Sequence, residues 1–142
     1  MRRIFVFLGM LFVLLSPPIG RASERIGITE HRDEKGKNTY YSTSPELLSR
    51  SPSWDLTGNP PLSIEAAVTK AKEWIRTRYP SFIPEEVVNI SLGRIYEPEI
   101  GNRWYYTVSL QARTTTDGVD TEKFFSVIVL LDGSVVEPSD SK

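Results

Sequence analysis

Residues 104–112, WYYTVSLQA, alternate between two sets of side chains along the chain. One set is mostly large and apolar and comprises Trp104, Tyr106, Val108, Leu110 and Ala112. The other set comprises Tyr105, Thr107, Ser109 and Gln111. Alternation with a period of two, in a segment rich in aromatic and β-branched residues, predicts a strand with one face against a core.

Neighbouring segments predict further strands of the same sheet. Residues 88–92 also alternate, and residues 124–131 are apolar on both faces, which is typical of a central strand. Asp132 and Gly133 then form a tight-turn dipeptide, and a short last strand is expected before Pro138. The order of these segments predicts an antiparallel meander.

Residues 64–79 have the periodicity of a helix. Ser63 is the expected N-cap, Glu65 complements the helix dipole in the first turn, and Pro80 ends the run. The apolar residues three and four positions apart form one stripe: Ile64, Ala67, Val68, Ala71, Ile75 and Tyr79. We therefore expect the α+β class, with one N-terminal amphipathic helix packed on a three- to four-stranded antiparallel sheet.

The segment before this helix, residues 23–61, is poor in aliphatic side chains. Its first half predicts a hairpin, with arms at residues 25–31 and 38–42 and a turn at residues 33–37. Four prolines follow, and we interpret residues 44–61 as an extended connector. An extended or hairpin segment is thus expected ahead of the main domain.

Residues 1–22 have the parts of a cleavable signal peptide. Arg2 and Arg3 precede an apolar run at residues 4–15, and small residues lie around the expected cut after about Ala22. The run is shorter than the roughly 20 residues that span a bilayer, which disfavours the alternative of a transmembrane anchor. The sequence therefore predicts a secreted or periplasmic protein that keeps no stable membrane anchor after cleavage.

Composition narrows the chemistry that is expected of the chain. It contains no cysteine, which excludes disulfides, thiol catalysis and cysteine-ligated metals. The formal charge is −1, and removing the three arginines of the signal segment leaves −4, so no nucleic-acid partner is expected. We interpret His31, the one histidine, as a surface residue and the acids of residues 117–122 as a solvated hairpin tip. No catalytic, cofactor-binding or metal site is expected.

Three segments together resemble PepSY-type domains, small modules exported or exposed at bacterial envelopes. They are residues 62–67, LSIEAA, residues 104–108, WYYTV, and residues 127–136, VIVLLDGSVV. The resemblance covers about Leu62–Pro138 and implies a cystatin-like helix-on-sheet fold that binds or restrains peptides or proteases, without catalytic residues. The chain departs from the family pattern in its compact last turn and in the long connection between the second and third strands.

The chain is expected to divide into four parts. They are a signal peptide at 1–22, an N-terminal hairpin or linker segment at 23–61, the PepSY-like domain at 62–138 and a C-terminal tail at 139–142. A mature chain of roughly 120 residues is long enough for one domain and hardly for two.

Two aromatic side chains form the expected partner site. Alternation sends Tyr105 and Phe124 to the sheet face opposite the helix, where an aromatic patch would mark a binding surface. The alternative is that the N-terminal segment folds over this face with Tyr40, Tyr41 or Trp54.

The expected function is a non-catalytic module of the cell envelope that binds a peptide or an envelope protein through its sheet face or an edge strand. Two alternatives stay open. One is a structural or self-associating envelope protein that forms a homodimer. The other is a small pocket enzyme of cone-shaped α+β fold, which would need an enclosed pocket with a buried acid.

Overall fold

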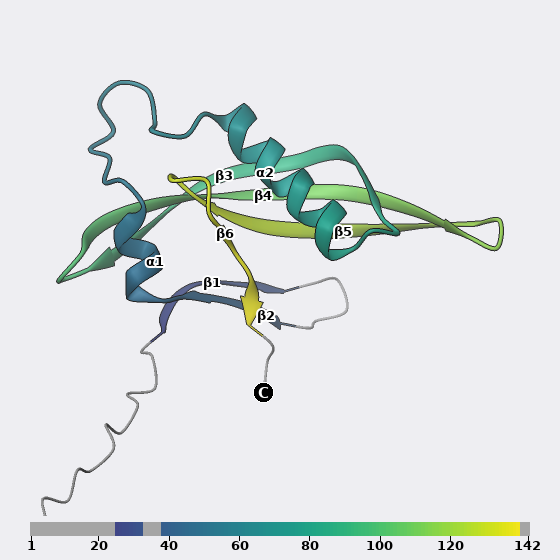
Figure 1. Cartoon of the computed structure of the whole chain (residues 1–142), viewed down its shortest axis with the longest axis horizontal. Coiled ribbons are helices and arrows are strands. Elements are labelled where there is room, and N and C mark those ends of the chain that lie inside the picture. Colours follow the sequence, from purple (N-terminus) through teal and green to yellow (C-terminus); the bar gives the residue numbers. More distant parts are fainter. Residues whose placement is uncertain (1–24, 33–37, 140–142) are drawn as a thin grey trace, which may run out of the picture.

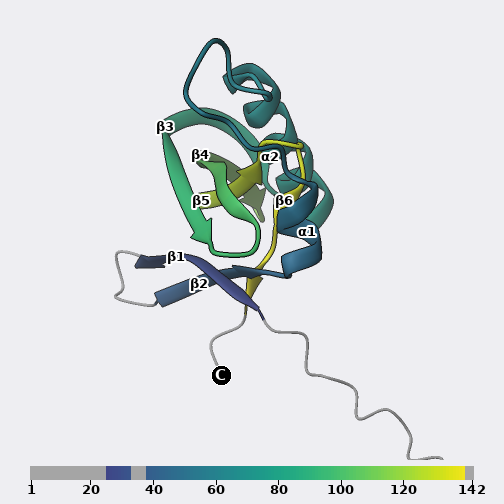
Figure 2. The same ribbon diagram turned by 90° about the vertical axis from the view of Figure 1, so that its left-hand side faces the viewer.

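The computed structural model describes residues 25–32 and 38–139, and these form three layers. In Figures 1 and 2 a long antiparallel sheet lies between a helix, α2, and a smaller sheet accompanied by a short helix, α1. The elements are β1 (Ile26–Arg32), β2 (Asn38–Thr43), α1 (Pro45–Arg50), α2 (Ile64–Arg78), β3 (Ile83–Glu97), β4 (Gly101–Thr116), β5 (Val119–Leu130), β6 (Val135–Val136) and β7 (Pro138–Ser139).

The four-stranded sheet has the order β3-β4-β5-β6, and all its pairs are antiparallel. β4 and β5 pair without interruption up to Thr116 opposite Val119. The two residues between them, Asp117 and Gly118, have φ values of 53° and 77°, as a type I′ turn requires. The long connection expected at this point is therefore wrong, because both strands continue to a two-residue turn.

The first core lies between α2 and the sheet. The helix begins and ends within a residue of its predicted bounds, and the Ser63 hydroxyl accepts a hydrogen bond from the Ala66 N–H at 3.1 Å. The hydroxyl of Tyr106 donates to the Leu62 carbonyl at 3.1 Å and joins the start of the helix to β4. The buried residues of this core are Ala67, Ala71, Ile75, Tyr106, Val108, Leu110, Ala112, Phe125, Val127, Val129 and Leu131.

A second core lies on the opposite face of the same sheet. Its buried residues are Ile26, Tyr41, Leu48, Ile95, Tyr105, Ile128, Leu130 and Val136. The strand β5 supplies alternate residues to both cores, so residues 127–130 are all buried, as expected of a central strand. The N-terminal segment therefore shares a core with residues 62–138.

The small sheet has the order β1-β2-β7 and includes the predicted hairpin, whose expected turn at residues 33–37 lies outside the described residues. Its third strand comes from the C-terminus, which leaves the large sheet after β6 and pairs with β2 (Figure 2). The Tyr41 hydroxyl donates to the Ser126 carbonyl at 2.6 Å, and the Leu131 N–H donates to the buried Ser51 hydroxyl at 3.1 Å. These contacts fasten the small sheet and its helix to the large one.

The predicted fold class is wrong. The described chain is mostly β, with two helices and two sheets, of which the larger is a curled four-stranded sheet, and not one helix on one sheet. The cause lies partly in the prolines. Pro45 occupies the first turn of α1, where its missing N–H costs nothing, and Ser44 caps that helix at the Leu47 N–H. Pro84 lies on the edge strand β3, where a missing donor is tolerated.

The predicted signal peptide, with its cut after about Ala22, lies outside the described residues. Among the residues that the structure describes, neither helix has the length and apolar character that a bilayer crossing requires.

Gly93 tests the packing of the second core. It lies opposite Tyr105, and a Cβ atom at Gly93 would overlap the Tyr105 ring. We expect Gly93→Ala to lower the free energy of unfolding by about 1–3 kcal/mol, because the ring must move. The matched control is Gly27→Ala in β1, where no heavy atom lies within 4 Å of the added Cβ. Urea unfolding followed by circular dichroism measures both, and equal effects would contradict this packing.

Tyr41 tests the contact between the sheets. Burial is the main cause that raises the pKa of Tyr41 to about 12. Because the pKa of Tyr41 is higher in the folded than in the unfolded state, its ionisation opposes folding. The contribution of neutral Tyr41 to the free energy of unfolding is fully present below pH 10 and is lost as the pH rises towards 12. We expect the unfolding free energy to fall less steeply over this interval in Tyr41→Phe than in the wild type. Tyr40→Phe, at an exposed neighbour, should keep the wild-type slope; identical slopes in all three proteins would refute the assignment.

Candidate functional site

The structure separates the two side chains of the expected partner site. Tyr105 and Phe124 lie on the same face of the sheet, as alternation predicts, but Tyr105 is buried beneath the small sheet. Its ring is 8% exposed, whereas Phe124 is 58% exposed. Phe124 lies six residues along β5 from Leu130, the partner of Tyr105, which is roughly 20 Å at about 3.3 Å per residue. The two rings therefore do not form one patch, and the N-terminal segment covers Tyr105.

The tip of the β4–β5 hairpin is an exposed polar arm. Arg113 lies between Glu85 and Glu122, at 3.6 and 3.0 Å, and the Thr115 hydroxyl donates to Asp120 at 2.6 Å. Within the described residues, no group of three or more acidic, histidine or cysteine side chains could hold a metal ion. The backbone of His31 lies in β1, and its side chain is outside the described part.

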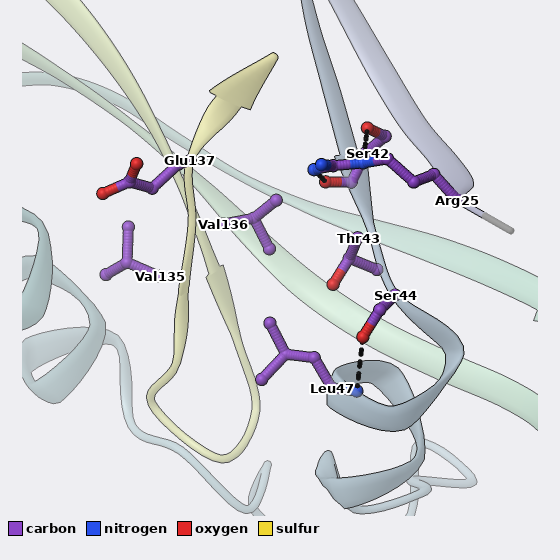
Figure 3. Close-up of a pocket in the computed structure, with 8 residues that line it drawn as sticks. All are labelled: Arg25, Ser42, Thr43, Ser44, Leu47, Val135, Val136 and Glu137. Carbon is purple, nitrogen blue, oxygen red and sulfur yellow. Dashed lines mark hydrogen bonds between the residues drawn. The ribbon is translucent and has the colours of Figure 1, made fainter. Parts of the chain in front are cut away.

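One surface depression lies between β2, the start of α1 and β6 (Figure 3), with a volume of about 520 Å³. Arg25 closes one side by donating to the hydroxyl and carbonyl of Ser42, both at 2.9 Å. The hydroxyl of Thr43 is buried there and has no hydrogen-bond partner in the described structure. Its other lining residues are Ser44, whose hydroxyl accepts a hydrogen bond from the Leu47 N–H, Glu137, and the apolar Leu47, Val135 and Val136.

A second depression, of about 620 Å³, lies between the start of β1, α1 and the β3–β4 turn. Its acids are Glu46, Glu97 and Glu99, and Arg25 is its cation. Hydrogen bonds at the start of α1 lower the pKa of Glu46, which therefore stays ionised at neutral pH. Like the first depression, it is open to solvent and does not enclose a ligand.

A long unpaired sheet edge in the described part of the chain is the outer edge of β3. This strand pairs with β4 on one side only and forms the margin of the large sheet in Figure 2. Four of the nine exposed large hydrophobic side chains in the described chain lie on it: Ile83, Val88, Leu92 and Tyr96. An edge strand leaves a row of backbone N–H and C=O groups without partners in its sheet.

The two halves of β3 differ in how open this edge is. The first half contains Pro84, two acids and two register shifts, at Pro84/Glu86 and Val87/Asn89. Such features protect an edge against strand addition. The second half, Asn89–Glu97, pairs with β4 residue by residue without any shift and would extend about 30 Å. We call Asn89–Glu97 the open edge.

One face of the open edge lies beside the indole rings of Trp104 and Trp54, which we call the aromatic floor. Leu92, Arg94 and Tyr96 share this face, and Arg94 lies opposite Trp104 of β4. The Arg94 guanidinium carbon is 5.8 Å from the Trp104 ring centroid, within the range of a cation–π contact. The Trp54 ring meets Trp104 edge to face at 5.9 Å, and the Trp104 indole donates to the Trp54 carbonyl at 2.7 Å. The loop before α2 thus fixes the floor.

The opposite face of the open edge is closed by the second core. Tyr105 lies over Gly93, and Ile95 is buried beside it. Burial raises the pKa of Tyr105, and a hydrogen bond with Thr29 of β1 partly offsets that effect. A strand added to the open edge would meet exposed side chains on one face, and the second core would hold the edge strand in place from the other face.

Sequence reasoning allowed for binding through an edge strand but did not identify residues 89–97 as that edge. The alternation of residues 88–92 placed Leu92 against the core, whereas its side chain is 39% exposed. Edge position depends on which strands pair, and the local pattern does not contain that information. The one available signal was Arg94, a charge at an alternate position that continues the same face.

Comparison with models of protein families finds no match, and comparisons with curated proteins and with solved structures find none. The resemblance to PepSY-type domains therefore stays a prediction.

Tyr105 and Phe124 provide a direct comparison of a core residue with a surface residue on the same sheet face. We expect Tyr105→Ser to lower the free energy of unfolding by about 3–5 kcal/mol, because it removes a buried ring. Phe124→Ser should change it by less than about 0.5 kcal/mol. Thermal and urea unfolding check both, and equal tolerance would show that Tyr105 is not part of the second core.

Proposed function

We propose that this protein is a non-catalytic module that binds extended peptide segments by adding them as a further strand to the open edge of β3. The observation that carries the proposal is a regular, shift-free half-strand that has a partner on one side only and exposed Leu92 and Tyr96 beside it. Strand addition to a sheet edge is an established mode of peptide recognition.

The backbone supplies the affinity in this mode. Each N–H and C=O group that points away from β4 can pair with the peptide main chain, and every second peptide side chain then falls on the same face as Leu92 and Tyr96. The bulges and acids in the first half of β3 would confine the peptide to the second half.

Burial in the described chain supports a non-catalytic role. A pocket enzyme of this size would need an enclosed acid, yet the buried polar side chains among residues 25–29 and 38–139 are Thr43 and Ser51. Both depressions are open at the surface. The binding of peptides agrees with the role that the PepSY resemblance implies, although the helix-on-sheet fold is not the one observed.

The site of action that we propose is the periplasm or the surrounding medium. This part of the proposal rests on the sequence of residues 1–22, with its basic start, apolar run and small residues before Ser23. Cleavage after about Ala22 would leave a chain without a stable membrane anchor.

A second copy of the chain is the competing occupant of the open edge. Two such edges can pair antiparallel about a two-fold axis and give a closed homodimer. The test must therefore measure the mass of the protein in solution beside its binding of a peptide.

Leu92 and Val88 allow a matched test on one strand. We expect a fluorescein-labelled peptide that alternates leucine and threonine to bind, and a version with proline at alternate positions not to bind, because proline cannot donate to the ladder. Leu92→Lys should weaken binding roughly tenfold, or about 1.4 kcal/mol, since an edge lysine deters strand pairing. Val88→Lys, at the shifted register, should bind like the wild type. Fluorescence anisotropy measures each of the three proteins with both peptides.

Hydrogen exchange gives an independent readout of the same test. The leucine–threonine peptide should slow exchange in the open edge and leave the β4–β5 tip unchanged. Equal weakening by both lysine variants would contradict the proposed position. A doubled mass in light scattering that Leu92→Lys returns to the monomer value would assign the edge to a second copy instead.

A further inference from the structure

We propose that the segment accepted by the open edge carries an acidic side chain, with an apolar side chain two residues before it and another two residues after it. This inference rests on the proposed function and names its partner class. It is carried by the position of Arg94 between Leu92 and Tyr96 on the exposed face of the edge.

Arg94 is a cation with unused hydrogen-bonding capacity. Its guanidinium carbon lies 5.8 Å from the Trp104 ring centroid, and this cation–π contact supplies no oxygen acceptor to the N–H donors of the group. Among residues 25–32 and 38–139, Arg94 forms neither an ion pair nor a side-chain hydrogen bond. An incoming carboxylate would therefore not have to displace an existing partner.

The floor under Arg94 is held in place before any ligand arrives. Trp104 is fixed by its hydrogen bond to the Trp54 carbonyl at 2.7 Å and by the edge-to-face contact of the two indoles. Asp55, the acid next to Trp54, accepts hydrogen bonds from the Thr57 N–H at 3.0 Å and the Thr57 hydroxyl at 2.6 Å. That carboxylate is engaged within its own loop, so Arg94 keeps its charge available at the edge.

Strand geometry converts this arrangement into a sequence preference. Side chains that share a face of a strand are two residues apart, and directly opposite residues in an antiparallel pair lie on the same face. A peptide residue opposite Arg94 would thus be flanked, at two residues on either side, by residues opposite Leu92 and Tyr96. These two side chains are 39% and 65% exposed and favour apolar neighbours.

The central residue is selected by charge. A guanidinium presents a planar fork of donors that matches a carboxylate in two parallel hydrogen bonds. The other positions nearest to Arg94 on this face, Asn102 and Tyr106, carry no charge at neutral pH that would compete. A lysine at the same peptide position would meet a like charge and be disfavoured.

Three labelled peptides test the inference. Each contains leucine, threonine, a variable residue, threonine and tyrosine in that order, flanked by threonines, and the variable residue is glutamate, glutamine or lysine. We expect the wild type to bind the glutamate peptide roughly tenfold more tightly than the lysine peptide at low salt, with the glutamine peptide between them. High salt should reduce this ratio, because the pair is exposed to solvent.

Charge reversal locates the preference. Arg94→Glu should invert the order of the glutamate and lysine peptides while binding the glutamine peptide as the wild type does. The matched control is Arg76→Glu on the exposed side of α2, which changes the net charge equally and should leave the order unchanged.

The outcomes separate the inference from the proposed function. Equal binding of the three peptides to the wild type would overturn the acidic preference and leave strand addition standing. An inversion by Arg76→Glu as large as that by Arg94→Glu would overturn it too, since net charge would then be the cause. Absence of binding by all three peptides, with exchange in the open edge unchanged, would overturn both.

Discussion

Residues 127–130 of β5 contribute side chains to two hydrophobic cores, one on each face of the sheet. Val127 and Val129 face α2, while Ile128 and Leu130 face the small sheet, and none of the four is more than 1% exposed. A strand buried on both faces needs a cover on each side, and the chain provides one from the helix and the other from its N-terminal hairpin. The three-layer arrangement and the burial of Tyr105 follow from this requirement.

Local patterns in the sequence predict individual helices and strands but do not predict how these elements pack together. The period of β4, the stripe of α2 and the doubly apolar run of β5 each reflect a face that the element buries, so the existence of all three could be predicted. The bounds of α2 agree with the prediction within a residue, whereas β4 and β5 extend towards their shared turn beyond the predicted segments. Alternation showed that Tyr105 points away from α2, but it contains no information on what covers the far face. The prolines of residues 44–61 indicated an extended connector, although Pro45 starts the helix α1.

The open edge illustrates the same limit at the functional level. Its value as a site comes from three distant parts of the chain: Arg94 on β3, Trp104 on β4 and Trp54 in the loop before α2. None of these residues is unusual in its own segment. The site exists because strand order leaves β3 without an outer neighbour, and because bulges close one half of that strand and not the other.

The C-terminal crossing has a kinetic consequence. The Ser139 hydroxyl donates to the Tyr40 carbonyl, a contact between residues 99 positions apart, so the small sheet is completed by a strand that lies far along the chain from the first hairpin. Contacts of such long range slow folding, because the entropy cost of closing the long loop precedes the stabilisation that the contact provides. The first hairpin would remain a marginal two-stranded unit until then.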